Sequence, residues 1–326
     1  MPKVLITTVP FGDKNDYPIE LLEKAGIEYL INPIGRKLSE DELAEMVQDF
    51  DAIIAGTEPI TDKVMQRGAN LKLISRVGIG LDSVDLLSAE KRGIIVSYTP
   101  DAPAPAVAEI TVGIALSLIR NVHVSNYQMH KGNWNRYFGK RISEITIGII
   151  GYGRIGSGFL ERLVGFSPFK VLVNDIKTID LSNFPFASKA TKEEIYKNCD
   201  LISIHVPLTS STKNMIKYET LKFMKSDACV INTSRGGIIN EADLYKVLKE
   251  GHLFGAAIDV FENEPYNGKL KELENCLLTS HMGSMSIDCR TSMEIEATKE
   301  VVRFFSKEPL VSIVPDEEYQ VQREKI

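Results

Sequence analysis

The sequence predicts an α/β protein made of two doubly wound parallel-sheet domains with a cleft between them. Short β-rich runs alternate with helical stretches along the chain, which is typical of parallel sheets covered by helices. The 326 residues suit two domains of about 100–200 residues each. A segment with three prolines, residues 98–105, separates two such alternating regions and indicates a boundary between domains.

The first domain is predicted to begin with a strand at residues 4–7 and a helix at residues 18–25, which Gly26 would end. Ser39 and Thr61 are each followed by acidic residues, a pattern typical of helix N-termini. Further strands are expected at residues 28–31, 52–55, 71–77 and 94–97.

The second domain is predicted to follow an apolar helix over residues 107–120. Its first strand, residues 145–150, has no polar alternation and should be buried on both faces. Trp134 is expected to pack at the junction of the domains. A helix over residues 286–305 should return to the first domain. Later strands of the second domain are expected at residues 170–174, 201–205, 228–232, 255–259 and 276–279.

Composition excludes several classes of function. The net charge of −6 argues against a nucleic-acid or membrane-surface partner, which would need a basic face. No apolar run reaches the 18 residues of a membrane span, and the N-terminus lacks the features of a signal peptide, so we expect a cytoplasmic protein. No metal site is expected, because the cysteines have no C-x-x-C spacing and should be buried, reduced thiols. They are Cys199, Cys229, Cys276 and Cys289.

A glycine motif, Gly151-Tyr152-Gly153-Arg154-Ile155-Gly156, follows the strand at residues 145–150 and opens a helix. In a Rossmann-like domain Gly151 would allow the tight turn, Gly153 would let the backbone approach a pyrophosphate, and Gly156 would let the helix pack on the strand. The helix N-terminus would then face the diphosphate. Asp175 ends the next strand, where a carboxylate accepts hydrogen bonds from ribose hydroxyls and repels a 2′-phosphate. The motif therefore favours NAD, while Lys177 leaves some use of NADP open.

Three later motifs complete a recognisable set: Asn232-Thr233-Ser234-Arg235-Gly236-Gly237, the run from Ala257 to Pro265, and Ser280-His281-Met282-Gly283. Together with the glycine motif they resemble the D-isomer-specific 2-hydroxyacid dehydrogenase family, particularly members similar to D-3-phosphoglycerate dehydrogenase. The resemblance implies hydride transfer between NAD and C2 of a small D-2-hydroxy or 2-keto acid. It also implies an NAD-binding domain over residues 101–285, a substrate-binding domain over residues 1–100 and 286–326, and a homodimer.

Three residues suit the chemistry of 2-keto acid reduction. Arg235 follows a strand, and its planar guanidinium matches a carboxylate. His281 is the natural acid/base near neutral pH, and Glu264 would orient its imidazole and stabilise the protonated form. The resemblance assigns these same roles to the three residues. Arg76 is the next candidate to bind the carboxylate.

The resemblance also implies residues that contact the cofactor or the substrate. The backbone amides around Val77 and Gly78 would help to hold the substrate carboxylate. Asp259 would lie at the nicotinamide side, and His205 has a purely structural alternative. The residues implied to line the cofactor site are His205, Pro207, Thr212, Thr233, Ser234, Arg235, Asp259 and Gly283.

Two questions stay open at this level. Glu58 stands where phosphoglycerate enzymes tend to carry arginine, so it would repel a phosphate. Arg36 and Lys37 could supply that charge, or they could be a solvated basic pair before a helix. A non-enzymatic NAD sensor resembling the C-terminal-binding-protein corepressors and a phosphite dehydrogenase are the alternative functions. A formate dehydrogenase of this fold would place glutamine where Glu264 stands.

Overall fold

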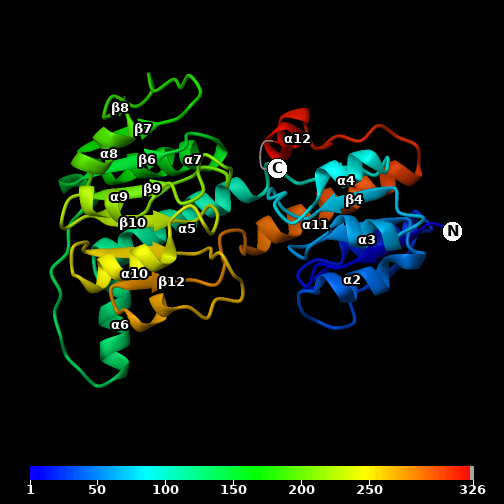
Figure 1. Cartoon of the computed structure of the whole chain (residues 1–326), viewed down its shortest axis with the longest axis horizontal. Coiled ribbons are helices and arrows are strands. Elements are labelled where there is room, and N and C mark those ends of the chain that lie inside the picture. The colour runs from blue at the N-terminus through cyan, green and yellow to red at the C-terminus, as the bar shows by residue number, and fades with distance from the viewer. Residues whose placement is uncertain (324–326) are drawn as a thin grey trace. The chain divides into compact units, whose positions relative to one another are not determined.

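The computed structural model describes residues 1–323 and divides into two compact units. Unit 1 comprises Met1–Pro103 and the chain from Met285 onward, and unit 2 comprises Ala104–Ser284. Each unit is a parallel β-sheet with helices packed against it (Figure 1). The predicted α/β class with two parallel sheets is confirmed.

Unit 1 has a five-stranded sheet in the order β2-β1-β3-β4-β5. Its strands are β1 (Lys3–Ile6), β2 (Glu28–Ile31), β3 (Ala52–Ala55), β4 (Leu73–Arg76) and β5 (Ile95–Ser97). Strands β3 and β4 are buried along their whole length; the apolar run of β3 predicts this, whereas β4 also buries Ser75 and Arg76. The helices are α1 (Tyr17–Lys24), α2 (Glu40–Met46), α3 (Asp62–Arg67), α4 (Leu86–Lys91), α11 (Ile287–Phe305) and α12 (Asp316–Arg323).

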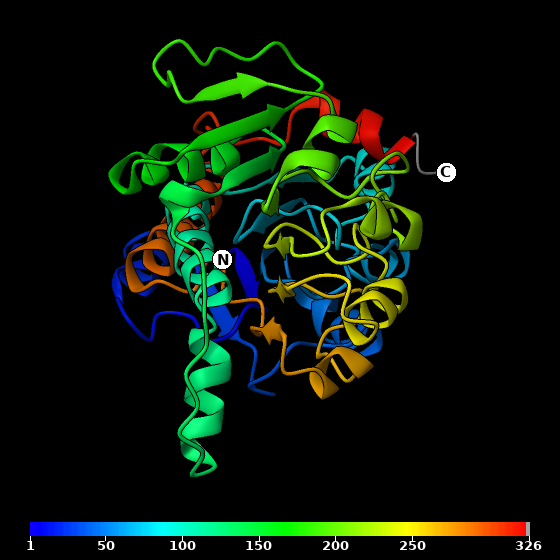
Figure 2. The same ribbon diagram turned by 90° about the vertical axis from the view of Figure 1, so that its left-hand side faces the viewer.

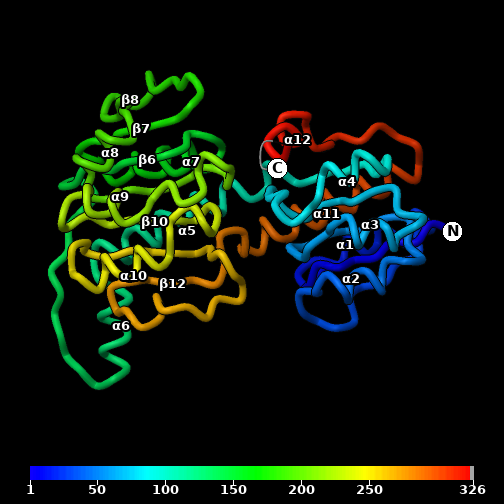
Figure 3. The backbone as a smooth tube through the Cα atoms, viewed as in Figure 1, coloured from blue at the N-terminus to red at the C-terminus, as the bar shows by residue number. Residues whose placement is uncertain are grey.

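Local signals place several of these helices. Ser39 caps α2, and its side chain and that of Glu42 form a reciprocal capping box. Gly26 follows α1 with a φ of +66°, which favours glycine. The returning helix α11 packs on the same sheet, where the Ser75 hydroxyl donates to the carbonyl oxygen of Ala297 at 2.8 Å. Figure 3 follows this orange segment past α1. The predicted return of the chain to the first sheet is therefore present.

Unit 2 has a seven-stranded sheet in the order β12-β11-β10-β9-β6-β7-β8. The order reverses at β6, whose neighbours are β7 on one side and β9 on the other. The strands are β6 (Thr146–Ile150), β7 (Lys170–Asn174), β8 (Ala187–Lys189), β9 (Leu201–Ile204), β10 (Cys229–Asn232), β11 (Gly255–Ile258) and β12 (Cys276–Leu278). The helices are α5 (Pro103–Ile119), α6 (Val122–His130), α7 (Arg154–Leu163), α8 (Lys192–Asn198), α9 (Tyr218–Phe223) and α10 (Glu241–Lys249).

The proline-rich segment is shorter than the sequence predicts. Helix α5 begins at Pro103, so Pro103 and Pro105 lie in its first turn, where the missing N–H groups cost no intrahelical bond. Most of its apolar side chains are buried in the unit 2 core. The structure also contains α6, α12 and β8, which the sequence patterns did not indicate. Among the described residues no single helix is long and apolar enough to cross a membrane, although α5 and α6 pass that test together as a pair bent by 67°.

An arm, residues 122–141, extends from unit 2. It consists of α6 and the irregular segment that returns beside it, as Figure 2 shows. The prediction that Trp134 packs at the junction of the domains is wrong, because this side chain lies on the returning segment and is 76% exposed.

Candidate active site

The residues predicted to act in catalysis and cofactor binding gather at one edge of the unit 2 sheet. Gly151, Asp175, His205, Thr233 and Asp259 each come directly after a strand. Because all seven strands are parallel, these strand ends meet at the carboxyl edge of the sheet. Ligands of such sheets bind outside this edge, where the strand order reverses.

The three glycines of the motif have different surroundings. Gly151 has a φ of +97°, and a Cβ there would lie 2.3 Å from the carbonyl oxygen of His205. A Cβ on Gly156 would lie 2.0 Å from the carbonyl oxygen of Gly151. Gly153, by contrast, has no atom within 4 Å of the position of a Cβ. Two glycines are thus required by packing, whereas the open space at Gly153, beside the N-terminus of α7, fits a dinucleotide pyrophosphate.

Asp175 is oriented by backbone amides. Its Oδ2 accepts a hydrogen bond from the amide of Tyr152 at 2.6 Å, and its Oδ1 accepts one from the amide of Lys177 at 2.7 Å. The first bond joins the end of β7 to the glycine motif. The carboxylate is therefore held beside the motif, while the neighbouring side chains of Ile176 and Lys177 are exposed.

His205 is half-buried at the end of β9, with its ring beside α7. Its Nε2 lies 2.9 Å from the Ser203 hydroxyl, and its ring lies 5.5 Å from that of Phe159. Burial lowers the pKa of His205 to about 3, so the imidazole is neutral at ordinary pH. Its buried Nδ1 has no hydrogen-bond partner within the described chain. Pro207 and Thr212 lie on the loop that follows, where the Thr212 hydroxyl donates to the carbonyl oxygen of Pro207 at 2.6 Å.

Arg235 lies on a turn that Asn232 organises. The Asn232 side chain donates to the carbonyl oxygen of Arg235 at 2.8 Å and accepts from the Ser234 hydroxyl, also at 2.8 Å. Thr233 lies 3.0 Å, between hydroxyl oxygens, from Thr111 on α5. The sequence motifs assign no role to Asn232 or Thr111, although an asparagine at a strand end, three residues before Arg235, is a signal for such a turn.

The arginine turn packs against the loop that carries Glu264. A Cβ on Gly236 would lie 2.0 Å from the backbone carbon of Phe261, so only glycine allows this approach. Glu241, at the start of α10, accepts a hydrogen bond from the amide of Glu262 at 2.8 Å. Burial raises the pKa of Glu241, with further contributions from Glu262 and Glu264. Sequence analysis missed Glu241 as a contact to this loop.

Glu264 and His281 form the predicted pair. The Nδ1 atom of His281 lies 2.8 Å from Oε2 of Glu264, and the amide of Phe261 donates to Oε1 at 3.0 Å. The His281 side chain is 41% exposed, so the imidazole is accessible to a ligand. Two strand-end loops thus bring together an imidazole and a carboxylate that lie 17 residues apart in the sequence.

Asp259 and Gly283 lie under the His281 loop. The Asp259 side chain is 1% exposed, and its Oδ2 accepts a hydrogen bond from the amide of Gly283 at 2.9 Å. The carboxylate therefore already binds the loop of unit 2, in addition to any contact with the nicotinamide that the resemblance implies.

In unit 1, Val77 and Gly78 follow β4 at the carboxyl edge of that sheet. The amide of Val77 donates to the carbonyl oxygen of Ala55 at 2.9 Å, and the amide of Gly78 donates to the Thr99 hydroxyl at 2.7 Å. Both amides are engaged within unit 1. The guanidinium of Arg76 packs over Gly78, where a Cβ would lie 3.0 Å from Nη1.

Glu58 also lies at the carboxyl edge of the unit 1 sheet. It is buried and accepts hydrogen bonds from the Thr7 hydroxyl and, at 2.8 Å, from the amide of Gly56. Arg36 is exposed and binds both carboxylate oxygens of Glu42, at 2.6 and 2.9 Å. This pairing lowers the pKa of Glu42 to about 2. Arg36 is therefore occupied by the helix-capping glutamate.

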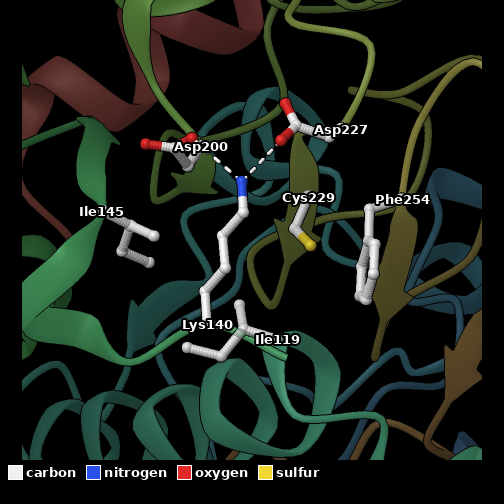
Figure 4. Close-up of a pocket in the computed structure, with 7 residues that line it drawn as sticks. All are labelled: Ile119, Lys140, Ile145, Asp200, Asp227, Cys229 and Phe254. Atoms are coloured by element: carbon white, nitrogen blue, oxygen red, sulfur yellow. Dashed lines mark hydrogen bonds and ion pairs between the residues drawn. The ribbon is translucent and has the colours of Figure 1, made fainter. Parts of the chain in front are cut away.

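A small cavity of unit 2 lies at the opposite edge of the sheet. Lys140 crosses it and lies 2.6 Å from an oxygen of Asp227 and 3.3 Å from one of Asp200 (Figure 4). Asp200 and Phe254 come just before β9 and β11, which places the cavity at the amino ends of the strands. It is therefore distinct from the cofactor edge and is not part of the candidate site.

Comparison with known proteins identifies the family. A model described as "D-isomer specific 2-hydroxyacid dehydrogenase, NAD binding domain" matches residues 112–283. A hydroxypyruvate reductase of Thermotoga maritima is 32% identical over 294 residues, which cover 86% of this chain and 95% of the relative. A glyoxylate reductase of Thermofilum pendens is 36% identical over 299 residues, covering 87% of each chain.

Solved structures agree with this result. The crystal structure of the TT0316 protein from Thermus thermophilus has a TM-score of 0.88 and 30% identity, and the match covers 96% of this chain and 100% of that one. The chain therefore belongs to the D-isomer specific 2-hydroxyacid dehydrogenase family, and it is an oxidoreductase that uses NAD to act on 2-hydroxy and 2-keto acids.

Proposed function

We propose that the protein reduces a small, unphosphorylated 2-keto acid to the D-2-hydroxy acid, with Arg235 binding the carboxylate and His281 donating the proton. The observation that carries this proposal is the 2.8 Å contact between His281 and Glu264 at the carboxyl edge of the NAD-binding unit. The packing of Gly236 against the backbone of residues 261–262 keeps the loop of Arg235 next to that of Glu264.

The chemistry needs a hydride, a proton and a fixed carbonyl. NADH, when bound, supplies the hydride to C2 of the keto acid. The guanidinium of Arg235 donates two parallel hydrogen bonds to the carboxylate and so orients the carbonyl. Because Nδ1 of His281 is held by Glu264, Nε2 is the ring nitrogen that gives its proton to the carbonyl oxygen. Glu264 stabilises the imidazolium that must be present before this step.

The absence of phosphate from the substrate is inferred from charges at the carboxyl edge of unit 1. Glu58 places a carboxylate there, and two hydrogen-bond donors hold it in position. Arg36, a candidate phosphate ligand, is paired with Glu42. Relatives of similar identity are named both for unphosphorylated acids, hydroxypyruvate and glyoxylate, and for D-3-phosphoglycerate, so the proposal depends on these charges alone. These features favour an unphosphorylated acid over phosphoglycerate.

The pH dependence of kcat/KM tests the catalytic pair. Reduction needs protonated His281, so it should fall as the pH rises, while oxidation of the hydroxy acid should rise. Glu264→Gln removes the charge that stabilises the imidazolium, so kcat/KM for reduction should be lower than in wild type along the falling limb of the pH profile. His281→Ala should abolish the limb and lower the rate about 10²- to 10⁴-fold. A limb that survives in His281→Ala would mean that another group is the acid.

The substrate class needs a separate measurement. Hydroxypyruvate and its 3-phosphate ester differ only in the phosphate, so they form a matched pair of substrates. Because like charges at a binding site are unfavourable, kcat/KM should favour hydroxypyruvate by at least about tenfold. A preference for the ester would refute the unphosphorylated class without affecting the roles of Arg235 and His281.

We also infer a homodimer, formed through the arm. The arm exposes Tyr127, Trp134, Tyr137 and Phe138, and aromatic residues are enriched in protein interfaces. The ion pairs of Lys140 hold the base of the arm, and Gln128, near the end of α6, donates through its side-chain amide to Glu274 at 2.9 Å. An arm that is already ordered loses little conformational entropy on association. A two-fold symmetric pair is the commonest closed assembly.

A cytoplasmic location is inferred from the thiols. All four cysteines are free and buried, which suits a reducing compartment. Fractionation of the source cells checks this inference, and recovery of the protein outside the cytoplasm would contradict it.

A further inference from the structure

The loop that carries His281 is bound to Asp259 on both sides of the histidine. The Asp259 Oδ1 accepts hydrogen bonds from the Thr279 hydroxyl at 2.6 Å and from the amide of Met282 at 2.8 Å. Its Oδ2 accepts from the amide of Gly283 at 2.9 Å. A buried carboxylate needs such donors, and here all three come from the loop. We call these three bonds the Asp259 clamp.

The clamp surrounds a residue in an unfavourable backbone conformation. His281 has a φ of +53°, in the left-handed region that side-chain-bearing residues seldom adopt. Its amide donates to the carbonyl oxygen of Asp259 at 2.8 Å, which ties the loop to the end of β11. Such a conformation persists only where the surroundings hold it. The same residue must also present its Nδ1 to Glu264.

Thr279 contributes the one side-chain donor of the clamp. It follows β12, and its amide donates to the carbonyl oxygen of Ile258 at 3.1 Å, so its own backbone is fixed by the sheet. Its hydroxyl therefore links a rigid strand end to the carboxylate that holds the amides of Met282 and Gly283. Without this hydroxyl, Oδ1 of Asp259 would keep only the bond from Met282, which belongs to the movable part of the loop.

We infer that Thr279 is a positioning residue for His281, acting through Asp259, an inference that rests on the proposed role of His281 as the acid/base. The hydroxyl fixes the orientation of the Asp259 carboxylate. The carboxylate in turn fixes the backbone of residues 281–283 and with it the imidazole that faces Glu264. Thr279 does not touch the reacting atoms.

The test compares Thr279→Val, which keeps the shape but removes the hydroxyl, with Thr279→Ser, which keeps the hydroxyl. Displacement of a catalytic group lowers turnover more than binding, so Thr279→Val should lower kcat about tenfold, with KM and the Kd for NADH within about twofold of wild type. Thr279→Ser should keep kcat within about twofold. If Thr279→Val does not fold, Thr279→Ala takes its place with the same expectations.

A readout independent of turnover is the ¹H–¹⁵N signal of the His281 Nδ1 proton in the cofactor-free protein, recorded where the imidazole is protonated. This signal should be present in wild type and Thr279→Ser, and it should shift or broaden in Thr279→Val. An unchanged signal and kcat in Thr279→Val, or equal losses in both variants, would overturn the inference. His281→Ala tests the proposed function separately: full activity there refutes the acid/base role, while the signal in wild type and the Thr279 variants still reports on the clamp.

Discussion

Arg235 presents its guanidinium from a turn whose backbone is fixed by the Asn232 side chain at 2.8 Å. This turn fixes the backbone position of Arg235. Binding of a substrate carboxylate then depends on the shape of the charged group. A guanidinium offers a planar fork of donors, whereas an ammonium offers a point charge on a flexible stem.

Arg235→Lys therefore keeps the charge and loses the fork. Removing one charge-assisted hydrogen bond costs about 1.5–3 kcal/mol, so kcat/KM for keto-acid reduction should fall about 10- to 100-fold. Steady-state kinetics at fixed NADH checks this expectation, and the Kd for NADH should be nearly unchanged. A value close to wild type would place the carboxylate elsewhere, with Arg76 as the next candidate.

The four thiols lie outside the site, and burial governs their chemistry. Burial raises the pKa of Cys199, Cys229 and Cys276 to about 12, and that of Cys289 to about 11. A thiolate forms in the folded protein only as the pH rises through these values, so the reactive form is scarce near neutral pH.

Native protein should therefore resist iodoacetamide at pH 8 and become fully labelled only in denaturant. Mass spectrometry after each treatment measures this difference. The raised pKa values also predict that stability depends on pH. The thiols favour the folded state at pH values below their unfolded pKa of about 8.5, and this contribution to stability declines as the pH rises above it. Rapid labelling of folded protein at pH 8 would contradict the assignment of all four as buried thiols.

At the scale of elements, the glycine motif between β6 and α7 combines packing and binding. Gly156 is pressed against the carbonyl oxygen of Gly151, whereas nothing lies within 4 Å of a Cβ at Gly153. Glycine is thus needed at position 156 for packing and at position 153 for cofactor binding. An alanine substitution at each position distinguishes these two requirements.

Gly153→Ala should keep the fold and weaken NADH binding at least about tenfold, because the methyl group occupies space that the pyrophosphate needs. Gly156→Ala should instead lower Tm by several degrees, since the Cβ would clash with backbone and push α7 from the strand. Thermal unfolding and NADH titration of both variants measure the two effects. Equal losses of stability would mean that Gly153 is also a packing glycine.

At the scale of the whole molecule, the main feature is the set of exposed aromatic residues on the arm, which make no contribution to the core of unit 2. Trp134 is 76% and Phe138 99% exposed, yet Lys140 and Gln128 bind the arm to the rest of unit 2. A rigid apolar surface of this kind is typical of an interface.

Light scattering should give wild type a mass near twice the 36.3 kDa of one chain. The double variant Trp134→Ser with Phe138→Ser should be monomeric, because it removes the two most exposed aromatics of the arm. Phe169→Ser is the matched control: this phenylalanine is also exposed, at 69%, but it precedes β7 and lies outside the arm. A dimer that survives the double variant would exclude the arm as the interface.

Much of the fold could be predicted because its information is local. Parallel strands buried on both faces have continuous apolar runs, so β3 and β7 begin and end where the sequence places them. The edge strand β2 also has its predicted bounds, although its side chains are exposed or half-buried. The capping box at Ser39 marks the start of α2 for the same reason. The site residues could be found because they stand in motifs that resemble those of a known family. The motifs follow parallel strands, whose carboxyl ends lie at one edge of the sheet. The strand β8 escaped prediction because it has three residues, which are mostly exposed.

The sequence by itself determined the two parallel sheets, the glycine motif and the residues that meet at the carboxyl edge. Only the tertiary structure decided which partners those residues take. Three of its results depend on where distant segments pack: the hydrogen bond from Thr7 to buried Glu58, the pairing of Arg36 with Glu42, and the exposure of Trp134. The positive φ of His281 and its clamp depend on the register between β11 and β12. Spacing along a chain encodes backbone conformation over a few residues, whereas a hydrogen bond between residues 20 or 50 positions apart exists only once the sheet has aligned them.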